Sequence, residues 1–217
     1  MISKNDQTLK VYARHAQFYE DDTLNDFNRD PKKTAKLMEN HHAFLDLSLK
    51  TIPKNGNLFE VGSGYGRDAI YIRSKGYNIQ VSDAVDSFIT RLQRDDFAPV
   101  KFNLITDEFT EKWQYILVNA VLVHFTKSDV VLAIKKIYDA LEPSGIFAFS
   151  LKQRAGGGED WKTDIAGEKR YFSYWDIGEI NQVVEDAGFE IVHIKQVGGI
   201  RACWLDVIVQ KPSKDES

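Results

Sequence analysis

Apolar positions recur at helical spacing through the first part of the chain. One set is Leu9, Tyr12, Ala13, Ala16 and Tyr19, and the next is Ala35, Met38, His42, Leu45 and Leu49. Each set predicts a helix with one apolar face. Asp30 followed by Pro31 is typical of a helix start, because a cap residue precedes a proline in the first turn. The turn at 53–56 ends this helical part.

After that turn, short apolar runs alternate with helical patterns. The runs predict strands at 57–61, 78–82, 100–104, 115–119, 145–151, 189–197 and 202–210. Helices are expected at 65–75, 85–94, 128–141 (with Ser128 as the cap) and 175–187. This alternation implies βαβ units and a mostly parallel α/β sheet. Only 198–201 separates the last two strands, which is too short for a crossover, so they are expected to form an antiparallel hairpin.

The residues Glu60–Asp68 form a glycine-rich turn between a predicted strand and a helix. Glycines let a ligand approach the backbone, and the helix start offers free N–H groups. A dinucleotide fingerprint would place its third glycine at position 67, where this chain has Arg67. Glu60 would also repel a diphosphate. A ligand with an ammonium group, such as S-adenosyl-L-methionine, suits that carboxylate better, and its own carboxylate could meet Arg67 or the helix start.

A second carboxylate, Asp83, ends the second predicted strand. There it can accept both hydroxyls of a ribose, as in ribose-binding α/β folds. Asp86 falls in the first turn of the next helix, where it supports the helix dipole.

These features together resemble a class I S-adenosylmethionine-dependent methyltransferase. The resemblance rests on Glu-x-Gly-x-Gly-x-Gly at 60–66, Asp83, and the Leu-x-Pro-x-Gly turn at Leu141–Gly145, and it covers about residues 50–210. It implies a seven-stranded, mostly parallel Rossmann-like sheet of order 3-2-1-4-5-7-6, with strand seven antiparallel and helices at the N-terminus. It also implies S-adenosyl-L-methionine as cofactor and S-adenosyl-L-homocysteine as product.

The resemblance also assigns the remaining cofactor contacts. The adenine is expected near Asn103 and Leu104, where many relatives carry an aspartate, and the methionine part near 119–121. The predicted cofactor-binding residues are Glu60, Gly62, Ser63, Gly64, Gly66, Arg67, Asp83, Ala84, Asn103, Leu104, Asn119, Ala120 and Val121.

The sequence indicates fewer residues for binding the methyl acceptor than for binding the cofactor. His124, just beyond the fourth strand, is the candidate general base, although a histidine there could simply pack the next helix. The segment 152–174 is expected to be a loop that either closes over the acceptor or is a solvated insertion. Tyr12 and Tyr19 are lid candidates or packing residues. The substrate and lid candidates are Tyr12, Tyr19, Lys152, Arg170 and Tyr171.

Composition narrows the partners. A net charge of −4 makes nucleic acid an unlikely partner. The single cysteine, Cys203, permits no intramolecular disulfide and suits the cytoplasm; it falls in an apolar strand pattern and is expected to be inert. No signal peptide or membrane-spanning run is seen. No metal is expected, because the neighbouring His41 and His42 would point about 100° apart on a helix.

The sequence thus predicts one domain, with a helical extension or lid at 1–50 and a methyltransferase core at 51–211. The predicted function is methyl transfer from S-adenosyl-L-methionine to an oxygen or nitrogen of a small molecule. The alternatives are a methyltransferase acting on RNA or protein, and a non-catalytic S-adenosylmethionine-binding protein. The oligomeric state is left open.

Overall fold

The computed structural model describes residues 3–199 and 202–213. Its helices are α1 Lys4–Arg29, α2 Pro31–Ser48, α3 Arg67–Ser74, α4 Asp86–Gln93, the 3-10 turn η1 Leu122–His124, α5 Lys127–Ala140 and α6 Ile177–Asp186. Its strands are β1 Leu58–Glu60, β2 Ile79–Asp83, β3 Val100–Lys101, β4 Trp113–Val118, β5 Leu141–Gln153, β6 Gly158–Ile165, β7 Glu168–Trp175, β8 Glu190–Gly198 and β9 Cys203–Gln210.

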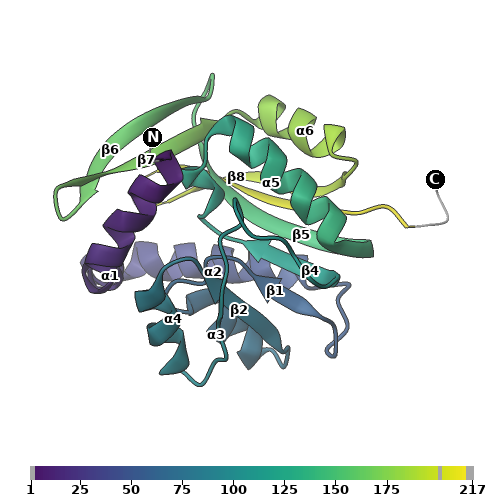
Figure 1. Ribbon diagram of the computed structural model, residues 1–217, viewed down its shortest axis with the longest axis horizontal. Coiled ribbons are helices and arrows are strands. Elements are labelled where there is room, and N and C mark those ends of the chain that lie inside the picture. Colours follow the sequence, from purple (N-terminus) through teal and green to yellow (C-terminus); the bar gives the residue numbers. More distant parts are fainter. Residues whose placement is uncertain (1–2, 200–201, 214–217) are drawn as a thin grey trace.

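The central sheet runs in the order β3-β2-β1-β4-β5-β9-β8 (Figure 1). All pairs from β3 to β5 are parallel, whereas β9 is antiparallel to both β5 and β8. The fold class is therefore confirmed: β9 and β8 correspond to the seventh and sixth strands of the predicted order. The predicted terminal hairpin is also present, although 200–201 of its turn lie outside the described residues.

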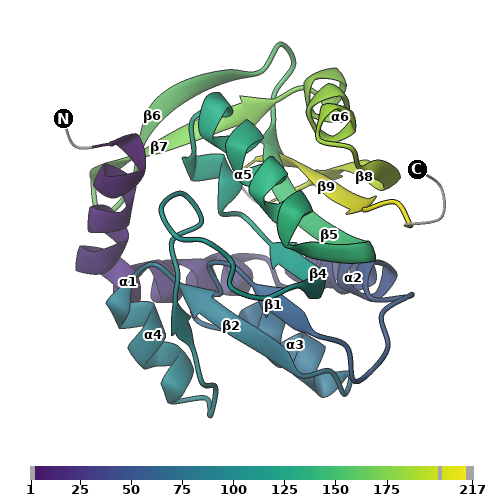
Figure 2. The same cartoon turned by 45° about the vertical axis from the view of Figure 1, so that its right-hand side comes forward.

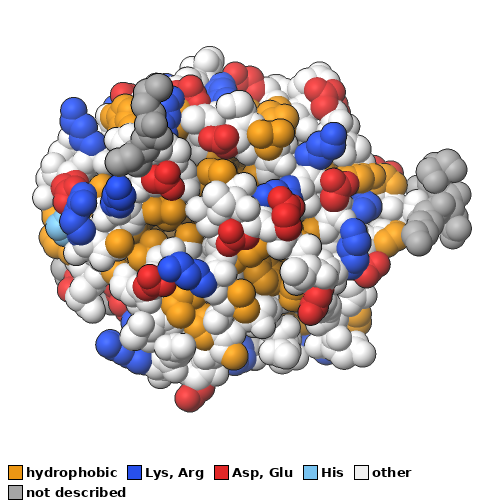
Figure 3. Space-filling view, in the orientation of Figure 1, with side chains coloured by type: hydrophobic (Ala, Val, Ile, Leu, Met, Phe, Trp, Pro, Cys, Tyr) orange, Lys and Arg blue, Asp and Glu red, His pale blue; other side chains and the backbone are white. Residues whose placement is uncertain are grey.

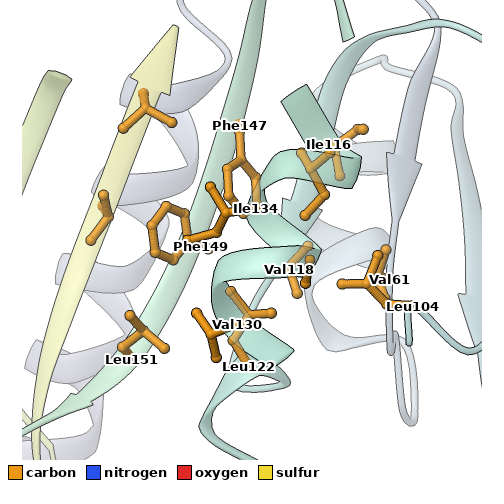
Figure 4. Packing of buried hydrophobic residues seen from close by; sticks show 14 of the residues in the cluster. Val61, Leu104, Ile116, Val118, Leu122, Val130, Ile134, Phe147, Phe149 and Leu151 are labelled. Carbon is orange, nitrogen blue, oxygen red and sulfur yellow. The ribbon is translucent and has the colours of Figure 1, made fainter. Parts of the chain in front are cut away.

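Two apolar clusters fix the layers of the molecule. On one face of the sheet, α5 and α6 share an apolar cluster with Ile116, Val118, Phe147 and Phe149 of the central strands. Figure 4 shows Val130 and Ile134 of α5 packed against these side chains. On the other face, α2, α3 and α4 pack over a second cluster. Because β4 and β5 are buried on both faces, their sequences read as nearly continuous apolar runs.

The N-terminal helices begin at side-chain caps. Ser3 and Asp6 form a capping box at α1, and the Asp30 carboxylate accepts from the Lys33 N–H at α2, as the Asp30-Pro31 pair predicts. α1 lies against β7 and crosses from there to α4, with a kink at His15 (Figures 1 and 2). This course carries α1 over the carboxyl ends of the strands.

Two local predictions are wrong. The segment 152–174 is not a loop: β5 continues to Gln153, and β6 and β7 form an antiparallel hairpin. β7 pairs with β5 only at Lys152 and Gln153, beyond the point where β4 stops. The cap of α5 is Thr126, whose hydroxyl accepts from the Asp129 N–H, and not Ser128. Cys203 lies in a strand, as its sequence pattern predicts, and its side chain is exposed at the start of β9.

Candidate functional site

The glycine turn after β1 is open to a ligand at one position and tightly packed at another. Gly62, Gly64 and Gly66 all have positive φ, a region that favours glycine. A Cβ on Gly62 would lie 2.4 Å from a methyl of Val121, so the backbone must pack closely there. A Cβ on Gly64 would meet nothing within 4 Å. The turn thus presents free space above Gly64.

Glu60 ends β1 beneath this turn and is almost fully buried. Its Oε2 has no hydrogen-bond partner. Burial, followed by the nearby Asp68 charge, raises the pKa of the Glu60 carboxyl to about 8. A buried, unpartnered carboxylate oxygen is costly, and a cationic group from a ligand would satisfy it.

A hydrogen-bonded network centred on Asp68 lies near Glu60. Asp68 of α3 accepts from Arg67 Nε at 2.7 Å, from His41 Nε2 at 2.9 Å and from Asn119 Nδ2 at 2.5 Å. Although burial opposes ionisation, Arg67 and His41 hold the pKa of Asp68 well below its usual range. The network continues from Asn119 to the Ser150 hydroxyl on β5. It fixes Asn119 at the end of β4.

The residue after Asn119 is strained. Ala120 has a φ of 57°, unusual for a residue with a Cβ. Its N–H donates to Ser150 Oγ at 2.9 Å, which helps to hold this conformation. Such strained positions are often found in binding sites, where the surrounding structure compensates for them.

Asp83, at the end of β2, faces the other side of the turn. Its carboxylate accepts from the N–H groups of Gly64 at 3.0 Å and Val85 at 2.9 Å. Burial raises the pKa of Asp83 to about 6, and the two backbone donors partly offset this effect. The side chain is therefore largely ionised at neutral pH and is locked in one orientation.

His124 is held in one tautomer by its neighbours. Its Nδ1 lies 2.8 Å from the Tyr171 carbonyl oxygen, which can only accept, so Nδ1 donates. Its Nε2 lies 2.9 Å from the Tyr12 hydroxyl and accepts the phenolic proton. The Tyr12 oxygen in turn accepts from Arg170. Burial and then the Arg170 charge hold the pKa of His124 well below its usual range, so the ring is neutral.

Two adjoining cavities join these groups. The larger cavity, of about 360 Å³, is lined by the glycine turn, Asn119, His124 and the end of β5. The last residues of β8 and the first residues of β9 also line it. The smaller, of about 110 Å³, contains Asp83 and the start of α4. They share seven lining residues: Tyr12, Tyr19, Gly62, Gly64, Asn119, Ala120 and His124.

The structure brings most of the sequence candidates to these cavities. The larger one is lined by Tyr12, Tyr19, Glu60, Gly62, Ser63, Gly64, Arg67, Asn119, Ala120, His124, Lys152 and Arg170. The smaller one adds Asp83, Ala84, Asn103, Leu104 and Val121. Gly66 and Tyr171 line neither cavity: Gly66 is the left-handed residue before α3, and the Tyr171 ring packs against Trp161. The Asn103 amide oxygen accepts from the Ile105 N–H, which shapes the loop.

Several lining residues were not predicted from sequence. His41 and Asp68 join the network at the glycine turn, and Ser150, Trp204 and Asp206 line the larger cavity from β5 and β9. Asp68 lies next to Arg67 in the motif and could have been found there. The β9 residues carry no motif, because they reach the cavity only through pairing with β5.

The fold and this double cavity define the class I methyltransferase architecture. The sheet has the strand order of this class. The glycine turn and the carboxylates that end β1 and β2 lie together at one edge of the sheet. Comparisons with known proteins agree. A family model described as "Methyltransferase domain" matches residues 31–194, well over half of the chain, and the protein belongs to this family.

The individual proteins compared with this chain share a quarter or less of its sequence. The S-adenosyl-L-methionine-dependent Diels-Alderase iliD of Neonectria sp. (strain DH2) is 25% identical over 201 residues, covering 87% of this chain and 78% of the relative. The 1,6-didemethyltoxoflavin-N1-methyltransferase of Burkholderia thailandensis has a TM-score of 0.65 at 19% identity, over 91% of this chain and 89% of that one. The N-methyltransferase NodS of Bradyrhizobium japonicum WM9 has a TM-score of 0.64 at 17% identity, over 81% and 87%.

These solved structures agree with S-adenosyl-L-methionine as the cofactor. Both were determined with S-adenosylhomocysteine bound. Among residues 3–199 and 202–213, no group of three or more His, Cys, Asp or Glu side chains suits a metal ion. Within the same ranges, no helix is both long and apolar enough to span a bilayer.

Proposed function

We propose that this protein transfers a methyl group from S-adenosyl-L-methionine to an oxygen or nitrogen atom of a small molecule. The observation that carries the proposal is the unpartnered Oε2 of Glu60, buried beside the open space above Gly64. The ammonium group of a ligand would supply the hydrogen-bond donor that this carboxylate oxygen lacks. The cofactor, when bound, supplies the electrophilic methyl group.

The described residues fit that cofactor from end to end. Glu60 would hold the ammonium group, and Arg67 or the start of α3 the carboxylate, since Nη1 of Arg67 is not used in its pairing with Asp68. Asp83 would accept the ribose hydroxyls in the smaller cavity. Asn103 and Leu104 would border the adenine, and 119–121 the methionine part.

On the acceptor side, His124 would act as the base through Tyr12. The Tyr12 hydroxyl lines the cavity and donates to Nε2 of His124. It can therefore take a proton from an acceptor as it passes its own proton to the imidazole. α1 supplies Tyr12, so we propose that residues 1–50 form the helical extension and lid, and 51–211 the core.

A small acceptor is favoured by the size of the larger cavity, about 360 Å³. The Burkholderia neighbour is named as an N1-methyltransferase of 1,6-didemethyltoxoflavin, and its structure was determined with that compound bound. On the face shown in Figure 3, basic and acidic side chains are intermixed, in keeping with the net charge of −4 and against a nucleic-acid partner. We also propose the cytoplasm as location, on the single-cysteine content.

Two measurements test the proposal. Calorimetry with S-adenosylmethionine, S-adenosylhomocysteine and NAD should give binding of the first two only; NAD binding alone would overturn the assignment. A turnover screen with a labelled methyl donor over metabolite, RNA and protein pools should then label a small molecule and release S-adenosylhomocysteine in equal amount.

The same screen separates the alternatives. Label in RNA or protein indicates a macromolecular acceptor. Substrate conversion without S-adenosylhomocysteine release would indicate a reaction such as the cycloaddition named for the Neonectria relative. Cofactor binding with no conversion indicates a non-catalytic binding protein.

A further inference from the structure

The smaller cavity is lined by a buried amide that has no partner within the described part of the chain. Asn5 lies in the first turn of α1, lines this cavity and is only 6% exposed. Its side chain makes no hydrogen bond to any described residue. An amide buried without partners costs free energy, and a ligand in the cavity would supply the missing hydrogen bonds.

The first turns of α1 are held in place by other contacts. Ser3 and Asp6 form the capping box that begins the helix. One turn later, the Thr8 hydroxyl accepts from the Tyr171 N–H at 3.1 Å. Asn5 and Thr8 are three residues apart, so they share one face of the helix, and both line the smaller cavity. The position of Asn5 is therefore fixed without any bond from its own amide.

The other amide and carboxylate side chains of the smaller cavity are already engaged. Asp83 accepts from two backbone N–H groups, and Asn119 is held between Asp68 and Ser150. The Asn103 amide oxygen accepts from a backbone N–H of its own loop at 3.1 Å. Asn5 differs from all three because both ends of its amide are open to a ligand.

The loop after β3 has used its acceptors within the protein. The carbonyl oxygens of Leu104, Ile105 and Asp107 accept from Lys136 Nζ at 3.1, 3.3 and 2.8 Å. The Asn103 carbonyl accepts from two N–H groups of the same loop. The Asp107 carboxylate accepts from the Asn103 N–H, and Asp107 lines a separate groove. An adenine beside this loop therefore needs an acceptor for its amino group from another element.

The place of Asn5 suits the base of the cofactor better than the methionine part. Tyr12 lines both cavities, whereas Asn5 lines only the smaller one, together with Asn103 and Leu104. Seven residues separate Tyr12 from Asn5, about 10 Å along a helix axis. The amide thus lies away from the wall that the two cavities share, in the cavity where we place the adenine.

We propose that Asn5 recognises the adenine of the cofactor. Its Oδ1 accepts from the exocyclic amino group, and its Nδ2 donates to the ring nitrogen beside that group. An amide matches this edge of adenine because it offers an acceptor and a donor side by side. The inference rests on the proposed function, since it concerns the cofactor of that same site, and it makes α1 a determinant of cofactor selectivity.

The test compares two ligands by calorimetry. One is S-adenosylhomocysteine, and the other is its analogue with purine in place of adenine, which lacks the exocyclic amino group. The wild-type protein should bind the purine analogue about fivefold or more weakly, because Oδ1 of Asn5 is then left without a donor. Equal affinity of the wild-type protein for both ligands overturns the proposal.

Asn5→Ala locates the effect. It should bind S-adenosylhomocysteine about tenfold more weakly than the wild-type protein, and it should bind the two ligands within about twofold of each other. A substitution that only disturbed α1 would weaken both ligands alike and leave their ratio unchanged, and that result also refutes the role of Asn5.

Gln7→Ala is the matched control. It removes an exposed amide from the same end of α1, and Gln7 lines neither cavity. This variant should keep the wild-type preference for S-adenosylhomocysteine over the purine analogue. A loss as large as that of Asn5→Ala would show that α1 as a whole, and not Asn5, sets the preference.

Analogues of S-adenosylhomocysteine without N1 or without N7 of the adenine test the second bond. One of the two should bind the wild-type protein about fivefold more weakly, and this loss should disappear in Asn5→Ala. Undiminished affinity for both analogues refutes the bond from Nδ2.

The same titrations separate this inference from the proposed function. Wild-type protein that binds S-adenosylhomocysteine without a preference over the purine analogue refutes the role of Asn5 alone. Wild-type protein that binds no S-adenosylhomocysteine refutes the proposed function itself.

Discussion

Binding of S-adenosylhomocysteine should release a proton from Glu60. In the free protein the pKa of this carboxyl is about 8, because the group is buried and lies near Asp68. At pH 7 such a group is about 90% protonated, since one pKa unit is a tenfold ratio. An ammonium group placed against Oε2 favours the ionised form and lowers the pKa. Each binding event at pH 7 should then release about 0.9 proton.

The sign of the pH dependence follows. The ligand prefers the ionised carboxylate, so its affinity should increase as pH rises toward the free-state pKa. For one proton with a pKa of about 8, the affinity should increase about fivefold between pH 7 and pH 8. Asp83 contributes little in this interval, because its pKa is about 6 and the group is already largely ionised at neutral pH.

Calorimetry in buffers of different ionisation enthalpy measures the released proton directly. Glu60→Gln is the control variant, because it retains the shape of the side chain and removes the ionisable group. It should bind S-adenosylhomocysteine without proton release and about 1.5–3 kcal/mol more weakly, the typical contribution of a hydrogen bond to a charged group. Wild-type binding without proton release, or equal release by Glu60→Gln, would refute the role of this carboxylate.

Three further outcomes are expected. Asp83→Asn should weaken S-adenosylhomocysteine binding by about 1–3 kcal/mol in calorimetry, and unchanged affinity would contradict a ribose contact. Tyr12→Phe and His124→Ala should each lower kcat about tenfold or more on an acceptor found in the screen. Both should leave the cofactor Kd within about twofold, and equal turnover would exclude the Tyr12–His124 pair as the base. Glu168→Gln removes the partner of Arg14 and His15 on α1. Stopped-flow should then show faster S-adenosylhomocysteine release, while the unfolding midpoint changes little because the Arg14–Glu168 ion pair is largely open to solvent.

The alternating strands and helices could be predicted because each one is indicated by the pattern of its own residues. Strand β1, the glycine turn and α3 follow one another within a few residues, and each is specified by its own pattern. The β6–β7 hairpin was missed for the opposite reason. β6 is largely polar and begins at the third of three consecutive glycines with positive φ, which is typical of a loop. Only its pairing with β7 makes it a strand, and that pairing is not a local property.

The candidate site divides in the same way. Glu60 and Asp83 could be found because they end β1 and β2, and parallel strands bring their carboxyl ends to one edge. Tyr12, His124 and Arg170 could not be grouped from sequence, since they come from α1, η1 and β7 and meet only when α1 packs on the hairpin.

The two segments with the least recognisable patterns therefore supply part of the wall of the larger cavity, where we propose that the acceptor binds. α1 contributes Tyr12, and the β6–β7 hairpin contributes Arg170 and Phe172. Both segments lie outside the repeating strand–helix units that hold Glu60 and Asp83. Under the proposed function, substitutions along β7 should change which acceptor binds while the packing of the sheet stays the same, whereas α1 also lines the smaller cavity that contains Asp83. Acceptor choice in this protein should accordingly depend on how α1 and the hairpin pack together, which no single motif in either segment specifies.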